Sequence, residues 1–561
     1  MHGLVGRRDM VALATLSLVA TGIPLWLSAA AGAIGIPSND DWVYMRAATS
    51  LFRTGTVDMP GHTAAAIGQI ALVQPLLWWS GGNAWAFTAF GLVMALIGVV
   101  STYLLARRFV GTGSAVLVVA LVVAFPGMAR ESATFMTDVP SYSLGVLCLL
   151  LGTRWLQGDG GPVTFVASLG VGLLAVSIRE FAIAAPAAIL VAAWARNRAD
   201  ERVWLAGASC VLVAGVAGVL IVAASIPGHV APGEVDLWRF SLLAPDFITF
   251  AAVLLPAAAL SMGRRIPTFS PSQILLGAGL VCIGAFLQNG PLLGNIWMSN
   301  GVAGDALLSG TRAPVISAPL WTLSGQLASL AAIIVAALAL RWGQRYLARA
   351  YSLSTAMRCA IQIARSREAP LVLFLVAYAA GLVVVASVSY PFDRYLYPMV
   401  PAAAILLLRE PALAPAFGRS QAFSHAAFAW LAVTAFVIAA NSFAYDAARY
   451  RNGEAAVAMG YDALTVDAGY EWVGYHATGH EELGSGAYGL TEYDDLWSSF
   501  RPCAVLSNSP LDVSALTLIR VDRSAYLNYL FFGPPEPLYL YGSTADGCPR
   551  LPAAAAGSTG S

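Results

Sequence analysis

Two adjacent carboxylates follow the first long apolar segment of the chain. They are Asp40 and Asp41, in the stretch PSNDDWVYMRAATSLF. A carboxylate at a membrane surface can act as a general base, bind a cation or cap a helix. Capping by Ser38, Asn39 or Asp40 would suit a helix that begins near this point, but capping needs only one such residue. The pair therefore leaves a structural and a chemical role open.

The composition shows what kind of protein carries this pair. Of the 561 residues, 58% are hydrophobic and only 11% are charged, and the mean hydropathy is +0.70. A soluble protein could not cover its surface with so few charges, so the chain is predicted to be a polytopic membrane protein. The formal net charge of zero gives no support for nucleic acid as a partner. The chain has no lysine, so a bound anion would meet arginine, histidine or backbone N–H groups.

Apolar runs long enough to cross a bilayer recur along the chain. They predict about thirteen transmembrane helices, at residues 10–31, 84–105, 113–126, 139–156, 163–178, 181–195, 203–226, 242–262, 271–288, 319–340, 370–389, 395–409 and 422–441. Most arginines of the connecting loops fall on one side of this arrangement, which indicates the cytoplasm. The expected protein is thus a multi-pass protein of the inner (plasma) membrane with a cytoplasmic N-terminus. The first run also resembles a signal peptide, but it is long for a cleaved one, so we expect a retained helix.

The chain divides into a membrane part and a tail of different composition. Residues 1–441 form the predicted membrane domain, with an external loop at 32–83, and residues 554–561 read as a disordered end. Between them, residues 442–553 are expected to form a small mixed α/β domain on the outer face. Its helix is YDAARYRNGEAAVAMGYDA and its short strands are LTVDAGYEWVGYH, CAVLSN, ALTLIRV and PLYLYG. Two cysteines of this domain, Cys503 and Cys548, allow a disulfide in an oxidising compartment.

Further charged residues lie on the predicted outer side. Asp138, in TFMTDVPSYSL, suits the first turn of a helix and an active site equally well. Arg179, in AVSIREFAIAAP, lies between two apolar runs, where a charge is costly and marks a binding site unless it simply meets headgroups and water. Arg312 is a further candidate for binding an anion. So is Arg394, which could instead pair with its neighbour Asp393 and anchor a helix end.

These features together resemble the GT-C superfamily of membrane glycosyltransferases, which includes protein O-mannosyltransferases and aminoarabinose transferases. The matching segments are the acidic pair in NDDWVYMRAATSLFRTG, the aspartate in TFMTDVPSYSL, the helix entry FDRYLYPMVP and the tail segment VDAGYEWVGYH. Each segment is weak alone, but their order and shared face make the combination more specific. Asp-Asp stands here where many members have Asp-Glu. The resemblance implies a GT-C fold for the all-α membrane domain.

The resemblance also implies roles for individual residues. The expected catalytic acids are Asp40 as the base, with Asp41 and Asp138 shaping the site. The expected phosphate-binding residues are Arg179, Arg312 and Arg394. The residues expected to shape the substrate pocket are Tyr44, Glu180 and Tyr395. The scattered histidines suggest no metal site, although relatives that place a divalent cation near their acids leave such a cofactor open.

The implied reaction needs few groups. A sugar on a polyprenyl phosphate leaves behind a phosphate, which is already a stable anion, so one base and one or two cations are enough. The expected function is inverting transfer of a hexose or pentose from this donor to a hydroxyl of a glycan, lipid or protein on the outer face. The alternative is a transporter or flippase, but such proteins often show internal repeats and mid-span charges, which the sequence lacks.

Overall fold

The structure is a computed structural model that describes most of the chain. The described residues are 6–59, 64–196, 202–227, 235, 237–262, 271, 275, 278–279, 282, 292, 294, 296–301, 308–347, 360–409, 419–476, 502–528 and 534–549. Most of the span expected at 271–288 and the terminal segment 554–561 lie outside them.

Eight of the described helices are long and apolar enough to cross a membrane. They are Arg7–Ala31, Trp85–Ala106, Asp138–Leu156, Arg202–Ser225, Arg239–Met262, Ala318–Arg341, Ala369–Val388 and Ser420–Ala458. Each coincides with one of the predicted spans, which supports the expected multi-pass membrane protein. Four other predicted spans are shorter helices: α5 (Thr112–Val123), α8 (Pro162–Val176), α9 (Ala184–Arg196) and α16 (Val400–Arg409).

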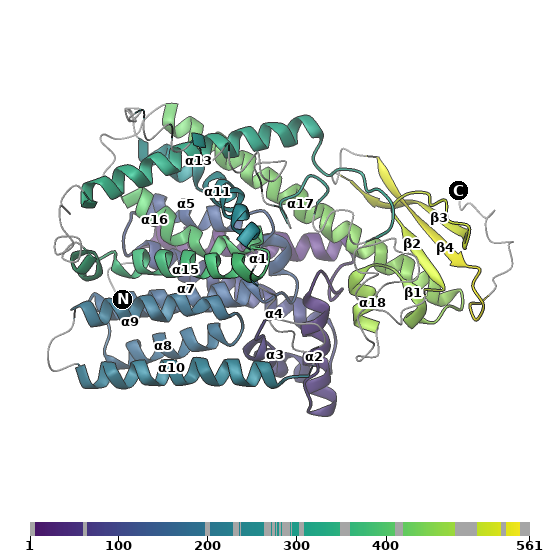
Figure 1. Cartoon of the computed structure of the whole chain (residues 1–561), viewed down its shortest axis with the longest axis horizontal. Helices are drawn as coiled ribbons and strands as arrows, with labels where there is room; N and C mark the ends of the chain where they lie inside the picture. Colours follow the sequence, from purple (N-terminus) through teal and green to yellow (C-terminus); the bar gives the residue numbers. More distant parts are fainter. Residues whose placement is uncertain are drawn as a thin grey trace.

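The long helices run side by side along the long axis of the molecule, as Figure 1 shows. In chain order they are α1 (Arg7–Ala31), α4 (Trp85–Ala106), α7 (Asp138–Leu156), α10 (Arg202–Ser225), α11 (Leu243–Met262), α13 (Ala318–Leu347), α15 (Ala369–Val388) and α17 (Arg419–Ala458). One continuous apolar core joins most of them. The outermost helices keep apolar faces exposed, as lipid-facing helices should: Val203 and Val211 of α10 are 85% and 69% exposed.

The external loop expected at 32–83 contains two helices, α2 (Asp41–Thr54) and α3 (Ile67–Ser80). A helix that begins near Asp40, as the first does, was considered in the sequence. The second was not, because its run of apolar residues is too short for a span. Gly55 ends α2 in the left-handed conformation, at φ 76°, which only glycine adopts without strain. Both helices lie at the end of the bundle nearest the C-terminal sheet (Figure 1).

The C-terminal part is a four-stranded sheet with helices beside it. The strands are β1 (Val466–Asp467), β2 (Ala504–Ser507), β3 (Leu516–Leu527) and β4 (Pro535–Ser543). Their order in the sheet is β1-β2-β4-β3; β1 is parallel to β2 and the other pairs are antiparallel. The last three strands were predicted. The disulfide that the sequence allowed is formed between Cys503, next to β2, and Cys548, after β4.

One prediction for this part was wrong. The segment LTVDAGYEWVGYH was expected to be a strand, but only Val466–Asp467 is extended, and Tyr470–His476 forms the short helix α18. Its alternating aromatic residues serve helix packing instead: α18 lies on α2 so closely that a Cβ at Gly474 would come within 2.4 Å of the Trp42 ring. The tail helix expected after residue 442 is likewise the continuation of α17, which runs unbroken to Ala458.

Candidate functional site

Asp40 occupies the cap position before α2, but its side chain makes no capping hydrogen bond. The preceding residue, Asn39, has a left-handed backbone with φ 57°, which asparagine tolerates better than most residues. This turn leaves the Asp40 carboxylate free to face away from the helix. Its Oδ2 accepts a hydrogen bond from Nη2 of Arg394 at 3.0 Å, and Oη of Tyr470 lies 3.5 Å from its Oδ1. The side chain is 37% exposed, so the carboxylate remains accessible.

Asp138, the first residue of α7, is buried and holds two arginines. Nη2 of Arg179 donates to its Oδ2 at 3.1 Å, and Nε of Arg394 lies 3.9 Å from the same oxygen. Arg394 therefore lies between Asp40 and Asp138. The structure thus brings together four of the predicted site residues, which come from the first external loop, the start of α7, the turn before α9 and the turn before α16.

The two arginines are buried but keep unused hydrogen-bond donors. Nε of Arg179, and Nε and Nη1 of Arg394, have no hydrogen-bond partner. Burial alone would lower the pKa of each guanidinium. For Arg179 the nearby Asp138, Tyr395, Tyr44 and Glu180 together outweigh it, and for Arg394 the nearby Tyr395, Asp138 and Asp40 do so. Both pKa values are therefore raised, and both groups stay charged. Unused donors on buried cations are suited to an anionic ligand.

Aromatic rings surround these arginines. The Arg179 guanidinium lies 5.4 Å from the Phe181 ring centre and 5.0 Å from that of Tyr395, and Arg394 lies 5.0 Å from the Phe392 ring. Such contacts hold a guanidinium without neutralising its charge. Tyr395, predicted to shape the pocket, is thus a wall of the arginine site.

Tyr44 and Glu180, the other two predicted pocket residues, lie beside this cluster. Burial raises the pKa of Tyr44, and the charges of Arg179, Asp40, Asp138 and Arg394 all act on it. Oε1 of Glu180 accepts a hydrogen bond from the backbone N–H of Ala65 at 2.6 Å. Glu180 thereby ties the start of α3 to the turn that carries Arg179.

Asp41 differs sharply from its neighbour. It is fully buried, and its carboxylate accepts hydrogen bonds from the backbone N–H groups of Ser38 and Phe135, the second at 3.1 Å. Burial raises its pKa well above the usual range, against the effect of these two hydrogen bonds. The acid thus joins the first external loop to the segment before α7. This geometry fits a positioning role for Asp41 and a chemical role for Asp40.

Arg312 and Asp393, which the sequence also singled out, contact other parts of the chain. Arg312 donates to Oδ1 of Asn441 on α17, and its guanidinium lies 3.7 Å from the Tyr445 ring centre. Its contacts therefore join α17 to the segment before α13, and none of those described is with the acids. Arg394 forms described ion pairs with Asp40 and Asp138, and the carboxylate of its neighbour Asp393 accepts from the backbone N–H groups of Ile296, Trp297 and Arg394.

Glu131, in the short helix α6 (Met128–Ser132), is a site residue that the sequence reading missed. It is buried, and neither carboxyl oxygen has a hydrogen-bond partner. Burial raises its pKa well above the usual range, and the nearby Asp138 raises it further. The buried Oη of Tyr397 also lacks a hydrogen-bond partner, and the charges of Glu131 and Asp138 act on the pKa of this tyrosine. The only sequence signal for Glu131 was an acid seven positions before Asp138.

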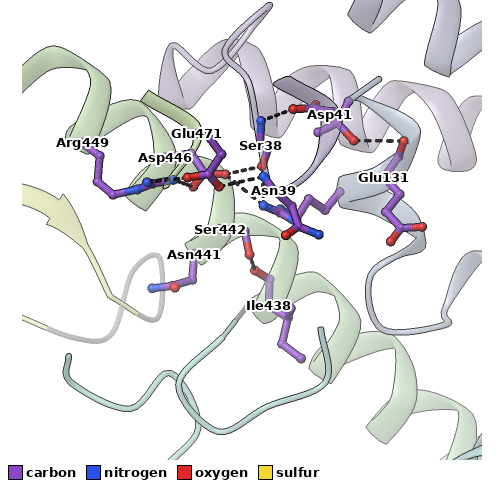
Figure 2. A network of polar contacts seen from close by, with 12 residues as sticks. Ser38, Asn39, Asp41, Glu131, Ile438, Asn441, Ser442, Asp446, Arg449 and Glu471 are labelled. Carbon is purple, nitrogen blue, oxygen red and sulfur yellow. Dashed lines mark hydrogen bonds and ion pairs between the residues drawn. The ribbon is translucent and has the colours of Figure 1, made fainter. Parts of the chain in front are cut away.

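A buried polar network holds the loop before Asp40 in place (Figure 2). Oγ of Ser38 donates to Oδ2 of Asp446 at 2.6 Å, and the backbone N–H of Asn39 donates to Oε1 of Glu471 at 2.7 Å. Arg449 donates to both of these acids, at 2.6 Å and 2.8 Å. Because Asp446 and Arg449 lie on α17 and Glu471 on α18, the C-terminal part helps to set the backbone conformation that presents Asp40.

An apolar groove begins at the Asp138–Arg179 pair and follows one face of α7. Its walls are Asp138, Ser141, Tyr142, Gly145, Val146 and Leu149 of α7, together with Arg179, Phe181, Ala182, Ala185, Phe374, Tyr378 and Pro398. The groove is narrow, with a volume of ≈ 20 Å³, on the order of one water molecule. A ligand tail would enter it only if side chains moved.

Among the described residues, no group of three or more His, Cys, Asp or Glu side chains could hold a metal ion. The divalent cation that the sequence left open stays a prediction. The charges that do converge are two carboxylates and two guanidinium groups.

No protein-family model matches the chain, and no curated protein matches it either. Solved structures do. ArnT from Cupriavidus metallidurans, bound to undecaprenyl phosphate, matches with 14% sequence identity over 72% of this chain and 76% of its own, at a TM-score of 0.34. The apo structure of the same protein matches at a TM-score of 0.32 with 14% identity, covering 70% of this chain and 77% of its own.

An oligosaccharyltransferase from Archaeoglobus fulgidus is a further match. It has 11% identity and a TM-score of 0.32, and the alignment covers 79% of this chain but 57% of the archaeal one. A second structure of it contains zinc and sulfate. At these TM-scores the likeness carries no argument about function.

Proposed function

We propose that the protein is a membrane glycosyltransferase that moves a sugar from a polyprenyl-phosphate donor to a hydroxyl group on the outer face of the membrane. One observation carries the proposal: two buried arginines with unused donors, Arg179 and Arg394, lie between an accessible carboxylate and an apolar groove. The arginines would bind the phosphate, and the groove would hold the prenyl chain. The carboxylate would take the proton of the acceptor hydroxyl.

The donor phosphate would bind at Arg179 and Arg394. Their free Nε and Nη1 atoms offer charge-assisted hydrogen bonds, which are stronger than neutral ones. The prenyl chain would follow the face of α7 formed by Tyr142, Val146 and Leu149 and displace side chains to widen the groove. The sugar would then lie at the outer end of α7, near Asp40.

Asp40 would act as the base. It takes the proton of the acceptor hydroxyl as the hydroxyl oxygen attacks the anomeric carbon and the bond from that carbon to the phosphate oxygen breaks. Attack from the side opposite the phosphate inverts the anomeric centre. The leaving polyprenyl phosphate keeps its negative charge, which the two arginines stabilise.

The proposed orientation places this site outside the cytoplasm. At the opposite end of the helix bundle from Asp138 and Arg179 lie Arg107 and Arg108, which follow α4, and Arg196, which ends α9. An excess of arginine marks the cytoplasmic side of a membrane protein. At the candidate site, in contrast, the described charges balance, because Asp40 and Asp138 meet Arg179 and Arg394.

Mass spectrometry of lipids that co-purify with the protein tests the proposal. We expect a polyprenyl phosphate that is retained by the wild-type protein and released after Arg394→Gln. Arg53→Gln, at an exposed position of α2, is the matched control and should retain the lipid. A protein that retains no such lipid, but transports a solute into vesicles, would be the transporter that the sequence left open.

A further inference from the structure

A second charged site lies at the other end of the bundle. A pocket of ≈ 520 Å³ opens between the ends of α4, α7 and α9 and the segment before α15. Five arginines line it, Arg107, Arg108, Arg196, Arg365 and Arg367, together with one acid, Asp159. Its volume is in the range of sites for small ligands.

The length of α7 places this pocket at the opposite membrane surface. The helix begins with Asp138 in the candidate active site and ends at Leu156, which lines the pocket. Its 19 residues span about 28 Å at 1.5 Å each, close to the thickness of a bilayer core. Trp155, Phe165 and Trp204 pack together at this end, with ring centres 4.5 Å to 5.8 Å apart, and aromatic clusters of this kind are typical of the membrane–water interface.

Hydrogen bonds to main-chain carbonyl groups fix three of the arginines. Nη1 of Arg196 donates to the carbonyl oxygen of Leu156 at 2.7 Å, and Nε of Arg365 donates to that of Ala195 at 2.7 Å. Nη2 of Arg367 donates to the carbonyl oxygen of Arg108 at 2.6 Å. These carbonyl groups lie at or just after helix C-termini, where cations are favoured, but they do not neutralise a full charge.

The positive charges of the pocket are only partly compensated. Arg107 pairs with Asp9 at 2.8 Å, and Arg108 pairs with Asp159. Within the part of the chain that the structure describes, Arg196, Arg365 and Arg367 form no ion pair with a carboxylate. Nε of Arg196 is buried and has no hydrogen-bond partner. Three uncompensated cations around one pocket repel one another, and an anion between them would remove that cost.

We propose that this pocket binds a phosphate group, supplied by the headgroup of an anionic lipid or by a soluble phosphate compound. Guanidinium groups match phosphate in geometry and charge, and basic pockets between transmembrane helices are suited to anionic headgroups. Exposed apolar residues near the same helix ends, such as Val163 at 80% and Val203 at 85%, would contact the acyl chains of a lipid. The site is separate from the proposed transferase site and does not depend on it.

The test uses full-length protein in vesicles of phosphatidylcholine alone or with added phosphatidylglycerol. Inorganic phosphate or pyrophosphate is titrated in the vesicles without anionic lipid. The readouts are thermal unfolding and the number of phosphatidylglycerol molecules retained in native mass spectrometry. We expect phosphatidylglycerol, pyrophosphate or both to stabilise the wild-type protein. Stabilisation by the lipid alone identifies a headgroup site, and stabilisation by the soluble anion alone identifies a soluble ligand.

The variant Arg365→Gln/Arg367→Gln should bind the anion that stabilises the wild-type protein roughly 10- to 30-fold more weakly, as expected for two lost arginine contacts. Arg7→Gln/Arg8→Gln removes the same charge from exposed positions at the start of α1 and should bind as the wild type does. Equal losses of affinity in the two variants would mean that net charge alone explains the binding, and would contradict a binding site in this pocket. So would a wild-type protein that neither anion stabilises, a result that does not depend on how the variants fold.

Discussion

Arg394 donates to Asp40 at 3.0 Å across 354 positions of sequence. The arginine is 3% exposed and the carboxylate 37%, so the contact joins a buried cation to an accessible acid. The same guanidinium has Asp138 on its other side. Arg394 therefore connects the first external loop, the start of α7 and the turn before α16, and its position determines whether the candidate site forms.

Arg179→Lys should weaken the binding of polyprenyl phosphate by about tenfold or more. Lysine keeps a positive charge beside Asp138, but it lacks the additional N–H groups with which a guanidinium binds phosphate. Lysine is a better probe than alanine, because removing the charge would leave Asp138 buried beside a more distant cation and cost about 3–5 kcal/mol. Donor affinity is measured with purified protein, and Arg53→Lys is the control. Unchanged affinity in Arg179→Lys would remove Arg179 from the phosphate site.

Glu131→Gln should make the protein more stable at alkaline pH. The pKa of Glu131 is raised in the folded protein, mainly by burial, so its contribution to the free energy of unfolding is complete at low pH and is lost as the pH rises through the folded pKa. Glutamine stays neutral and avoids that loss. Thermal unfolding in detergent between about pH 5 and about pH 9 measures the difference, which should grow with pH.

The control for this prediction is Glu454→Gln, at an exposed position of α17. Its effect on the unfolding temperature should not change over the same pH range. If Glu131→Gln showed a constant difference as well, Glu131 would bind the same number of protons in the folded and unfolded states over this range, and the raised pKa would be wrong.

Glu471 should matter for catalysis through the backbone of Asn39. Glu471→Ala removes the acceptor of the Asn39 N–H group and one partner of the buried Arg449, so both turnover and stability should fall, the latter by about 3–5 kcal/mol. Glu471→Gln keeps an acceptor oxygen for Asn39. It should restore most of the turnover and less of the stability, whereas equal turnover in the two variants would mean that this hydrogen bond does not position Asp40.

The Cys503–Cys548 disulfide should stabilise the C-terminal sheet. It closes a loop of 45 residues, so replacing both cysteines by serine should cost about 2–4 kcal/mol. Unfolding followed by urea, with and without a reducing agent, measures this. A wild-type protein that a reducing agent does not destabilise would contain free thiols at these positions.

The sequence predicted the parts of the site that depend on local pattern. Long apolar runs marked the spans, and the charges next to them marked Asp40, Asp138, Arg179 and Arg394, because a charge beside a span is costly unless it has a partner. Asp40 was expected to be the base and Asp41 to shape the site, but the local sequence pattern gives no physical reason for that difference. That difference depends on the turn at Asn39, which points one carboxylate toward Arg394 and the other toward backbone N–H groups of Ser38 and Phe135.

The sequence did not predict contacts between residues that are far apart in the chain. Arg312 was named beside Arg179 as a candidate for binding an anion, yet it packs on Tyr445 of α17, because the segment before α13 meets the C-terminal part of the chain. Glu131 was missed for the opposite reason: a single acid in a short loop carries no pattern, and only burial without a partner distinguishes it. The helix α18 was read as a strand, since seven residues rich in aromatics fit both periods.

The central claim is that Asp40 is the base and Asp41 is a positioning residue. Transfer of labelled sugar from a polyprenyl-phosphate donor by Asp40→Asn and Asp41→Asn protein, with donor binding measured in parallel, tests it most directly. Asparagine keeps the size of the Asp40 side chain but not its basicity, so we predict that turnover falls by roughly two to four orders of magnitude while the donor stays bound. Asp41→Asn should lower the stability more than Asp40→Asn does, because a buried carboxyl that accepts two backbone hydrogen bonds is replaced. Sugar transfer at a near-normal rate by Asp40→Asn would contradict the account.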